Sequence, residues 1–359
     1  MGAKMVSLNQ RIRGCLLGGA VGDALGAPIE FDSLAEIRRR FGRDGLTDYA
    51  PAFGRRGTIT DDTQMSLFTG EGLIRAWVRM EERGICHPPS VVHHAYLRWL
   101  LTQSEQSCPE LEIEPDGWLF AVSALHSRRE PGTTCISSLR AASRFGVPEV
   151  ADNASKGCGG VMRVAPVGLM SRQAGSYKET FKLGIDTASL THGHPTGYLA
   201  AGYFATVIAA IVSGESLLNA MDIAYIELAK CVRSEEVKEA IEAARRTASL
   251  GAPSPEQIEM LGGGWIAEEA LAITLCCALT ARDFKHGVLM AVNHSGDSDS
   301  TGAMTGNLLG SMLGANSIPG VWLRELECRA AIEQLADDLH LVRSGNANAD
   351  RMSERYPGW

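Results

Sequence analysis

Two segments of the chain carry a glycine at every fourth position, and this spacing constrains the fold more than any other feature. One segment has glycine at positions 14, 18, 22 and 26, and the other at 302, 306, 310 and 314. Because the α-helix has 3.6 residues per turn, each set lines one face of a helix and forms a glycine ridge. Glycine destabilises a helix by about 1 kcal/mol relative to alanine. We therefore expect tight backbone packing along each ridge to offset that cost.

Helical periodicity also dominates the rest of the chain. Apolar residues recur at spacings of three and four in segments 215–232, 235–250 and 267–281, whereas alternating strand patterns are hard to find. Short linkers containing Gly, Pro or Ser separate the helical segments, and no long linker indicates a domain boundary. The sequence therefore predicts an all-α, single-domain fold of a dozen or more helices.

Charge and cysteine content exclude several classes of protein. The net charge is −8 and no basic run is present, which argues against a nucleic-acid groove. No stretch approaches ~18 uninterrupted apolar residues, so no membrane span is expected. The start of the chain lacks the apolar core of a signal peptide. Nine scattered cysteines without a CxxC pair argue against a disulfide framework or a zinc site, and a cytoplasmic location is expected.

Two acidic clusters lie far apart in the sequence, each where a loop meets a helix. Thr60 is a candidate N-cap with Asp61 and Asp62 in the first turn, and the second cluster is Asp297–Ser300. Either cluster alone is also explained by a favourable helix-dipole interaction. Together, without a lysine or arginine inside them, their oxygens are typical hard ligands for Mg²⁺, Mn²⁺ or Ca²⁺. Several carboxylates could serve two ions.

Two acidic residues of the first glycine segment and a glycine-rich loop complete the set of candidates. Asp23 is interpreted as a capping or hydrogen-bonded structural acid, and Glu30 follows the ridge. Gly157, Gly159 and Gly160 lead into an apolar run that is compatible with a helix. Backbone N–H groups in such a loop can bind a phosphate, although the pattern alone is weak evidence.

Five motifs in order resemble the ADP-ribosylglycohydrolase family: RIRGCLLGGAVGDALGAPIEF, TDDTQM, KGCGGVMRVAP, SLTHGHP and GDSDSTGAMTGNLLG. The resemblance implies a compact orthogonal multi-helix bundle over residues 8–343, followed by a polar C-terminal tail, 344–359. It also implies two Mg²⁺ or Mn²⁺ ions and a catalytic Glu30 near the scissile bond. Metal ligands would be Thr60, Asp61, Asp62, Asp297, Asp299 and Ser300. The diphosphate of ADP-ribose would contact Gly157, Gly159, Gly160, Met162 and His192.

The resemblance further implies hydrolytic removal of ADP-ribose from a modified protein. Arginine, through an N-glycosidic bond, is the expected linkage, and serine-linked or O-acetyl-ADP-ribose are the alternatives. Another Mg²⁺-dependent hydrolase acting on a phosphorylated small molecule also stays open. A different class of function is a regulatory or immunity protein that binds ADP-ribose or an ADP-ribosyltransferase toxin without essential turnover. No role is assigned to Glu130, where some relatives carry aspartate.

Overall fold

The computed structural model describes residues 6–107, 111–144, 150–171 and 177–358, and these ranges contain helices and no strand. The predicted all-α fold with a dozen or more helices is confirmed. The α-helices of the described chain are α1 Leu8–Gly26, α2 Leu34–Phe41, α3 Asp61–Arg83, α4 Pro88–Thr102, α5 Thr133–Arg140, α6 Ala165–Met170, α7 Tyr177–Ser189, α8 Pro195–Val212, α9 Leu217–Leu228, α10 Glu235–Ser249, α11 Pro255–Glu259, α12 Ala267–Thr280, α13 Phe284–Val292, α14 Ser298–Leu313, α15 Gly320–Glu325, α16 Arg329–Ser344 and α17 Ala349–Arg355. Three short 3₁₀ helices are η1 Ser123–Leu125, η2 Cys158–Gly160 and η3 Ala315–Ser317.

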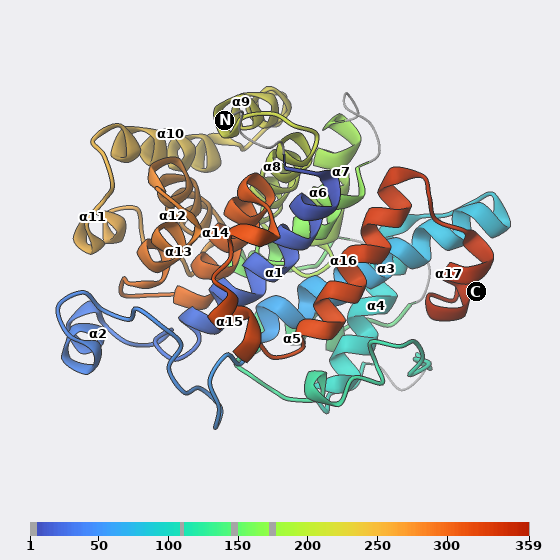
Figure 1. Ribbon diagram of the computed structural model, residues 1–359. Helices are drawn as coiled ribbons and strands as arrows, with labels where there is room; N and C mark the ends of the chain where they lie inside the picture. The colour runs from blue at the N-terminus through green and yellow to red at the C-terminus, as the bar shows by residue number, and fades with distance from the viewer. Residues whose placement is uncertain (1–5, 108–110, 145–149, 172–176, 359) are drawn as a thin grey trace.

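The two glycine ridges pack against each other at the centre of the molecule, where α1 and α14 run antiparallel (Figure 1). Gly18 faces Gly306 and Gly22 faces Gly302 along this contact. A β-carbon on Gly302 would lie 2.5 Å from the carbonyl oxygen of Gly22, so a larger residue would force the backbones apart. The expected tight packing is therefore present, and it places the end of α1 beside the start of α14.

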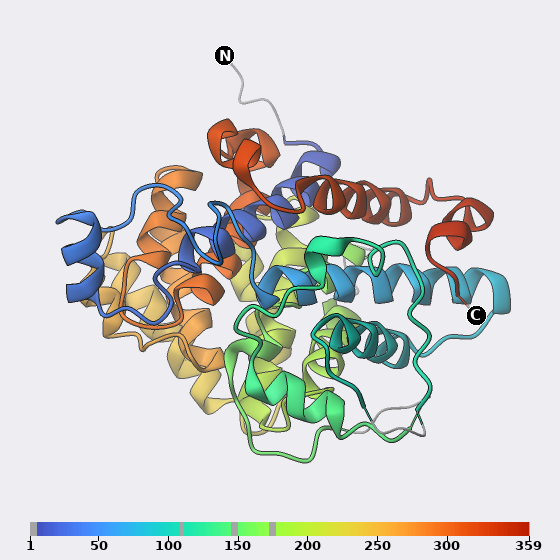
Figure 2. The same ribbon diagram turned by 90° about the horizontal axis from the view of Figure 1, so that it is seen from below.

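Helix α3 begins next to this pair and runs away from it between α4 and α16 (Figures 1 and 2). Thr60 caps its start, as predicted, and Gly84 ends it with a φ of +70°. Buried Glu71 accepts hydrogen bonds from Arg75 at 3.1 Å and from Arg98 of α4 at 2.9 Å. These charge-assisted bonds join α3 to α4 and hold the long helix in place.

The premise that no stretch is long and apolar enough to span a membrane is wrong for α8, whose length and composition are sufficient. However, 94% of its 18-residue window is buried inside the fold, where α6, α7, α9 and α12 contact it. The apolar composition follows from this central position, since every face of the helix meets other side chains.

Residues 344–358, which belong to the segment described above as a polar tail, contain α17 and fold back toward α3 and α16. Met352 and Tyr356 are buried, and the Tyr356 hydroxyl donates a hydrogen bond to Asp338 at 2.7 Å. Arg355 also donates to the Asp338 carboxylate. Most side chains of this segment are polar, and it docks through both these two buried side chains and hydrogen bonds to Asp338.

Candidate active site

A cavity of about 360 Å³ opens where several helix ends meet. Its wall combines the turn after α1, the first turns of α3 and α14, the start of α5 and the 157–162 loop. Thr60 and Gly160 do not line the cavity but are buried beside lining residues. The other site residues expected from the sequence all line it: Glu30, Asp61, Asp62, Gly157, Gly159, Met162, His192, Asp297, Asp299 and Ser300.

The first turn of α3 presents two carboxylates to this cavity. The Thr60 hydroxyl accepts a hydrogen bond from the Asp62 amide at 3.3 Å, so it serves as the helix cap. The Gly132 amide donates to Asp61 Oδ2 at 3.2 Å. Asp62 Oδ1 is buried and has no hydrogen-bond partner among the described residues. A buried carboxylate oxygen without a donor is able to serve as a ligand for a cation.

Asp23 lies behind this turn and fixes it to α1. Its carboxylate accepts hydrogen bonds from the amides of Thr60 at 3.0 Å and Thr63 at 3.1 Å, and from the Thr63 hydroxyl. Burial raises the pKa of Asp23 to about 6, although these hydrogen bonds oppose the shift. The interpretation of Asp23 as a hydrogen-bonded structural acid is confirmed.

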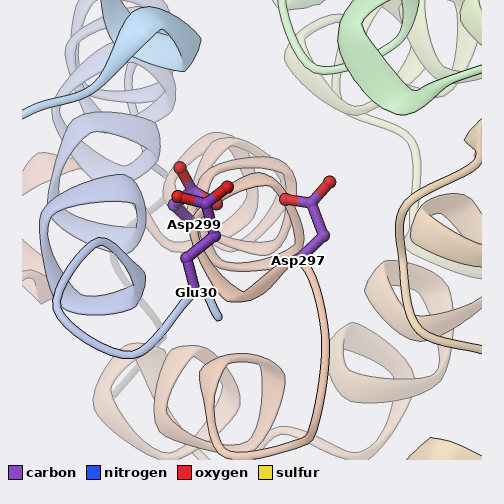
Figure 3. Close-up of side chains that lie close together, drawn as sticks. All are labelled: Glu30, Asp297 and Asp299. Atoms are coloured by element: carbon purple, nitrogen blue, oxygen red, sulfur yellow. The ribbon is translucent and has the colours of Figure 1, made fainter. Parts of the chain in front are cut away.

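Glu30 meets the first turn of α14 because the glycine ridges bring the two segments together. The Asp297 side chain caps α14 by accepting from the Ser300 amide at 3.3 Å. Glu30, Asp297 and Asp299 each place a carboxylate oxygen within 4.8 Å of the others. Figure 3 shows the three side chains, with Glu30 on the turn after α1 and both aspartates at the start of α14.

The electrostatics of this cluster favour bound cations. Burial, followed by the charges of Asp297 and Asp61, raises the pKa of Glu30 to about 9. Burial likewise raises the pKa values of Asp62 and Asp299 well above the usual range, with neighbouring carboxylates adding to the effect. Carboxylates this close repel one another unless protons or metal ions neutralise them. The hard oxygen donors and the unpartnered Asp62 Oδ1 fit a divalent cation of the Mg²⁺ or Mn²⁺ type.

The glycine-rich loop packs directly on the His192 ring. A β-carbon on Gly159 would lie 3.1 Å from His192 Cε1, and one on Gly160 would lie 3.3 Å from Nδ1. Small residues are therefore needed to keep the ring against the loop. The Cys158 amide already donates to the Trp265 carbonyl at 3.0 Å, and the Gly157 amide to Ser155 Oγ at 3.3 Å. The loop is thus held at its start before any ligand binds.

Nine cavity residues were not assigned a role from the sequence: Phe31, Glu130, Pro131, Gly132, Thr133, Thr134, Cys135, Cys158 and Trp265. The rings of Phe31 and Trp265 stack with centroids 5.7 Å apart. The Cys158 thiol donates to Asp297 Oδ2 at 2.7 Å, so it contacts a candidate metal ligand. Phe31 and Cys158 both lie within motifs of the family resemblance given above, and those motifs are a signal that could have identified them. Trp265 follows three glycines but belongs to no quoted motif.

Comparisons with known proteins point to one family. A family model described as ADP-ribosylglycohydrolase matches residues 5–349. The ADP-ribosyl-[dinitrogen reductase] glycohydrolase of Rhodospirillum rubrum is 25% identical, over 91% of this chain and 94% of its own. ADP-ribosylarginine hydrolase Tri1 of Serratia proteamaculans is 24% identical, over 92% of this chain and 78% of its own. A solved structure titled "ADP-ribosylglycohydrolase-related protein complex" matches with a TM-score of 0.64 and 25% identity, over 94% of this chain and 100% of that one.

Proposed function

Because the chain belongs to the ADP-ribosylglycohydrolase family, we propose that this hydrolase removes ADP-ribose from arginine side chains of a modified protein. We further propose that it uses two Mg²⁺ or Mn²⁺ ions. The observation that carries the proposal is the meeting of two acidic helix starts and Glu30 in one cavity. This cavity also contains the glycine-rich loop, which suits a phosphorylated ligand.

The carboxylates of Asp61, Asp62, Asp297 and Asp299, with the Ser300 hydroxyl, would hold the ions. Bound there, the ions would supply Lewis acidity and a template for the ribose hydroxyls. The remaining steps belong to the chain itself. The 157–162 loop and His192 bind and orient the diphosphate, which directs the distal ribose toward the acidic cluster.

Hydrolysis breaks the bond between ribose C1″ and the guanidino nitrogen, as in other glycoside hydrolyses. The hydroxyl of water goes to C1″, and a proton goes to the departing nitrogen. Glu30 is the group that would transfer this proton, because its carboxyl lies in the same cavity beside the proposed metal ligands. The stacked Phe31 and Trp265 rings border the same cavity and would limit the access of water.

The arginine linkage is supported by the relatives, one of which is named an ADP-ribosylarginine hydrolase. We also propose a reducing, cytoplasmic setting, which agrees with the free state of the eight cysteines in the described residues.

A substrate panel tests the proposal directly. Purified protein is given ADP-ribosyl-arginine, a serine-linked mono-ADP-ribosyl peptide, O-acetyl-ADP-ribose and ADP-ribose-1″-phosphate, each with Mg²⁺, with Mn²⁺ or with EDTA. Metal-dependent release of ADP-ribose from arginine ahead of the other substrates is the expected result. Preference for another linkage would correct the substrate, and tight binding of ADP-ribose without turnover would indicate a binding protein. Hydrolysis that resists EDTA would overturn the role of the ions.

A further inference from the structure

Arg163 is a fully buried cation directly behind the glycine-rich loop, and its hydrogen bonds run to sulfur, hydroxyl and carbonyl acceptors. Nη1 lies 3.3 Å from Cys135 Sγ and 3.4 Å from Met65 Sδ, and the guanidinium is 4.3 Å from the centre of the Tyr96 ring. In the described part of the chain, no carboxylate forms an ion pair with it. Its shortest hydrogen bond, 2.6 Å, runs from Nη2 to the Thr191 hydroxyl oxygen.

This hydrogen bond bears on the direction of the next one. The Thr191 oxygen accepts from Arg163, so its own single hydrogen is free to be donated. Two acceptors are available, His192 Nδ1 at 2.8 Å and the Ala188 carbonyl at 3.5 Å. The shorter contact has ordinary hydrogen-bond length, whereas the longer one is at the limit. Accepting from a cation also makes the hydroxyl a stronger donor. The distances therefore favour donation from Thr191 to His192 Nδ1 over donation to the Ala188 carbonyl.

A neutral imidazole that accepts at Nδ1 carries its proton on Nε2. Burial, with a smaller contribution from the Arg163 charge, lowers the pKa of His192 to about 3, so the ring is neutral at working pH. Nε2 lies on the side of the ring next to Gly157 and Gly159, where an added β-carbon would be 3.4 Å from it. Both glycines and His192 line the cavity.

We propose that Arg163 and Thr191 form a relay that fixes His192 as the Nε2–H tautomer, so that His192 donates a hydrogen bond to a diphosphate oxygen of ADP-ribose. Arg163 and Thr191 act as positioning residues, since both work through His192. The proposal rests on the proposed function for the identity of the ligand. The tautomer itself depends only on the protein and can be measured without any substrate.

The first experiment measures the tautomer by two-dimensional NMR of the ¹⁵N-histidine-labelled protein, with His192→Gln identifying the His192 signals. We expect the Nε2–H form in the unmodified protein and in Thr191→Ser, which keeps the hydroxyl. Thr191→Val removes the donor to Nδ1 and should shift His192 toward the Nδ1–H form. An Nδ1–H ring in the unmodified protein, or an unchanged Nε2–H ring in Thr191→Val, would overturn the relay.

The second experiment measures ADP-ribose affinity by calorimetry at saturating Mg²⁺. Thr191→Val should weaken binding about 10-fold, as expected for one hydrogen bond to a charged group, and Thr191→Ser should restore it. Thr187→Val is the matched control, because Thr187 is equally buried one helical turn earlier and its hydroxyl has no partner among the described residues. Its affinity should match that of the unmodified protein.

The two experiments separate the relay from the proposed function. If ADP-ribose binds equally well to Thr191→Val and the unmodified protein, the relay has no role in binding and the proposal fails. If the unmodified protein shows the Nε2–H ring but does not bind ADP-ribose, the proposed ligand fails while the tautomer assignment stands. Turnover adds one more check, because a lost ligand contact raises KM more than it lowers kcat.

Discussion

Gly22 of α1 and Gly302 of α14 meet so closely that a β-carbon on Gly302 would lie 2.5 Å from the Gly22 carbonyl oxygen. This contact belongs to a ridge that continues to Gly26, which packs on the Ser298–Asp299 backbone. The distance between Glu30 and Asp299 therefore depends on glycines that take no part in the chemistry. The contact between α1 and α14 therefore both stabilises the fold and sets the spacing of the acidic cluster.

Gly302→Ala should destabilise the protein by at least about 3 kcal/mol, at or beyond the usual upper range for overpacking, because backbone atoms rather than flexible side chains must move. Chemical denaturation measures the change. Gly320→Ala in α15 is the control, since only the flexible Arg324 side chain lies near its added methyl group, and its stability should stay within about 1 kcal/mol. Equal stability of the two variants would contradict the close packing of α1 and α14.

Asp62→Asn and Asp299→Asn should each abolish metal-dependent release of ADP-ribose. Each variant removes one carboxylate from a buried cluster that we propose to hold two ions, so the stoichiometry of Mn²⁺ in calorimetry should fall from two to one or none. Asp44→Asn provides a control with an exposed carboxylate that does not line the cavity. Full activity in either cluster variant would remove the metal assignment.

Glu30→Gln should lower kcat about 10²- to 10⁴-fold, the usual contribution of a general acid or base. The amide keeps the shape of the side chain but cannot transfer the proton, so ADP-ribose affinity should change only a few-fold. Glu82→Gln near the end of α3 is the exposed control and should behave like the unmodified protein. Normal turnover of Glu30→Gln would exclude the catalytic role.

The metal-free protein should lose stability as the pH rises from 6.5 to 9. The folded state raises the pKa of Glu30 to about 9, so it holds a proton that the unfolded chain has already released. The stabilisation from this proton is complete at pH values below the pKa of Glu30 in the unfolded chain, and it is lost as the pH passes about 9. The free energy of unfolding therefore falls as the pH rises. Denaturation in EDTA at several pH values measures it.

Two additions make this pH experiment decisive. Glu30→Gln cannot titrate, so its stability in EDTA should fall less over the same range. Saturating Mg²⁺ should stabilise the protein more at pH 9 than at pH 6.5, because fewer protons then compete for the carboxylates. An identical slope for Glu30→Gln would show that other groups cause the pH dependence.

Much of the site could be predicted because its residues follow local rules. Thr60 caps α3 as its sequence position indicated, and Asp297 caps α14. The burial of α8 at the centre of the fold could not be predicted, since the composition of a helix gives no information about the helices around it. The docking of Tyr356 on Asp338 was equally invisible, because it depends on how the segment after α16 folds back on that helix.

The sequence by itself determined the helices, the two glycine ridges and the acidic residues at helix starts, because periodicity and capping depend on neighbours within a few residues. Only the tertiary structure decided that one ridge packs on the other and that Glu30 thereby meets Asp297 and Asp299. It also decided that Arg163 reaches His192 through Thr191. The physical reason is that a ridge specifies close approach but not its partner, which is selected when all the helices pack into one core.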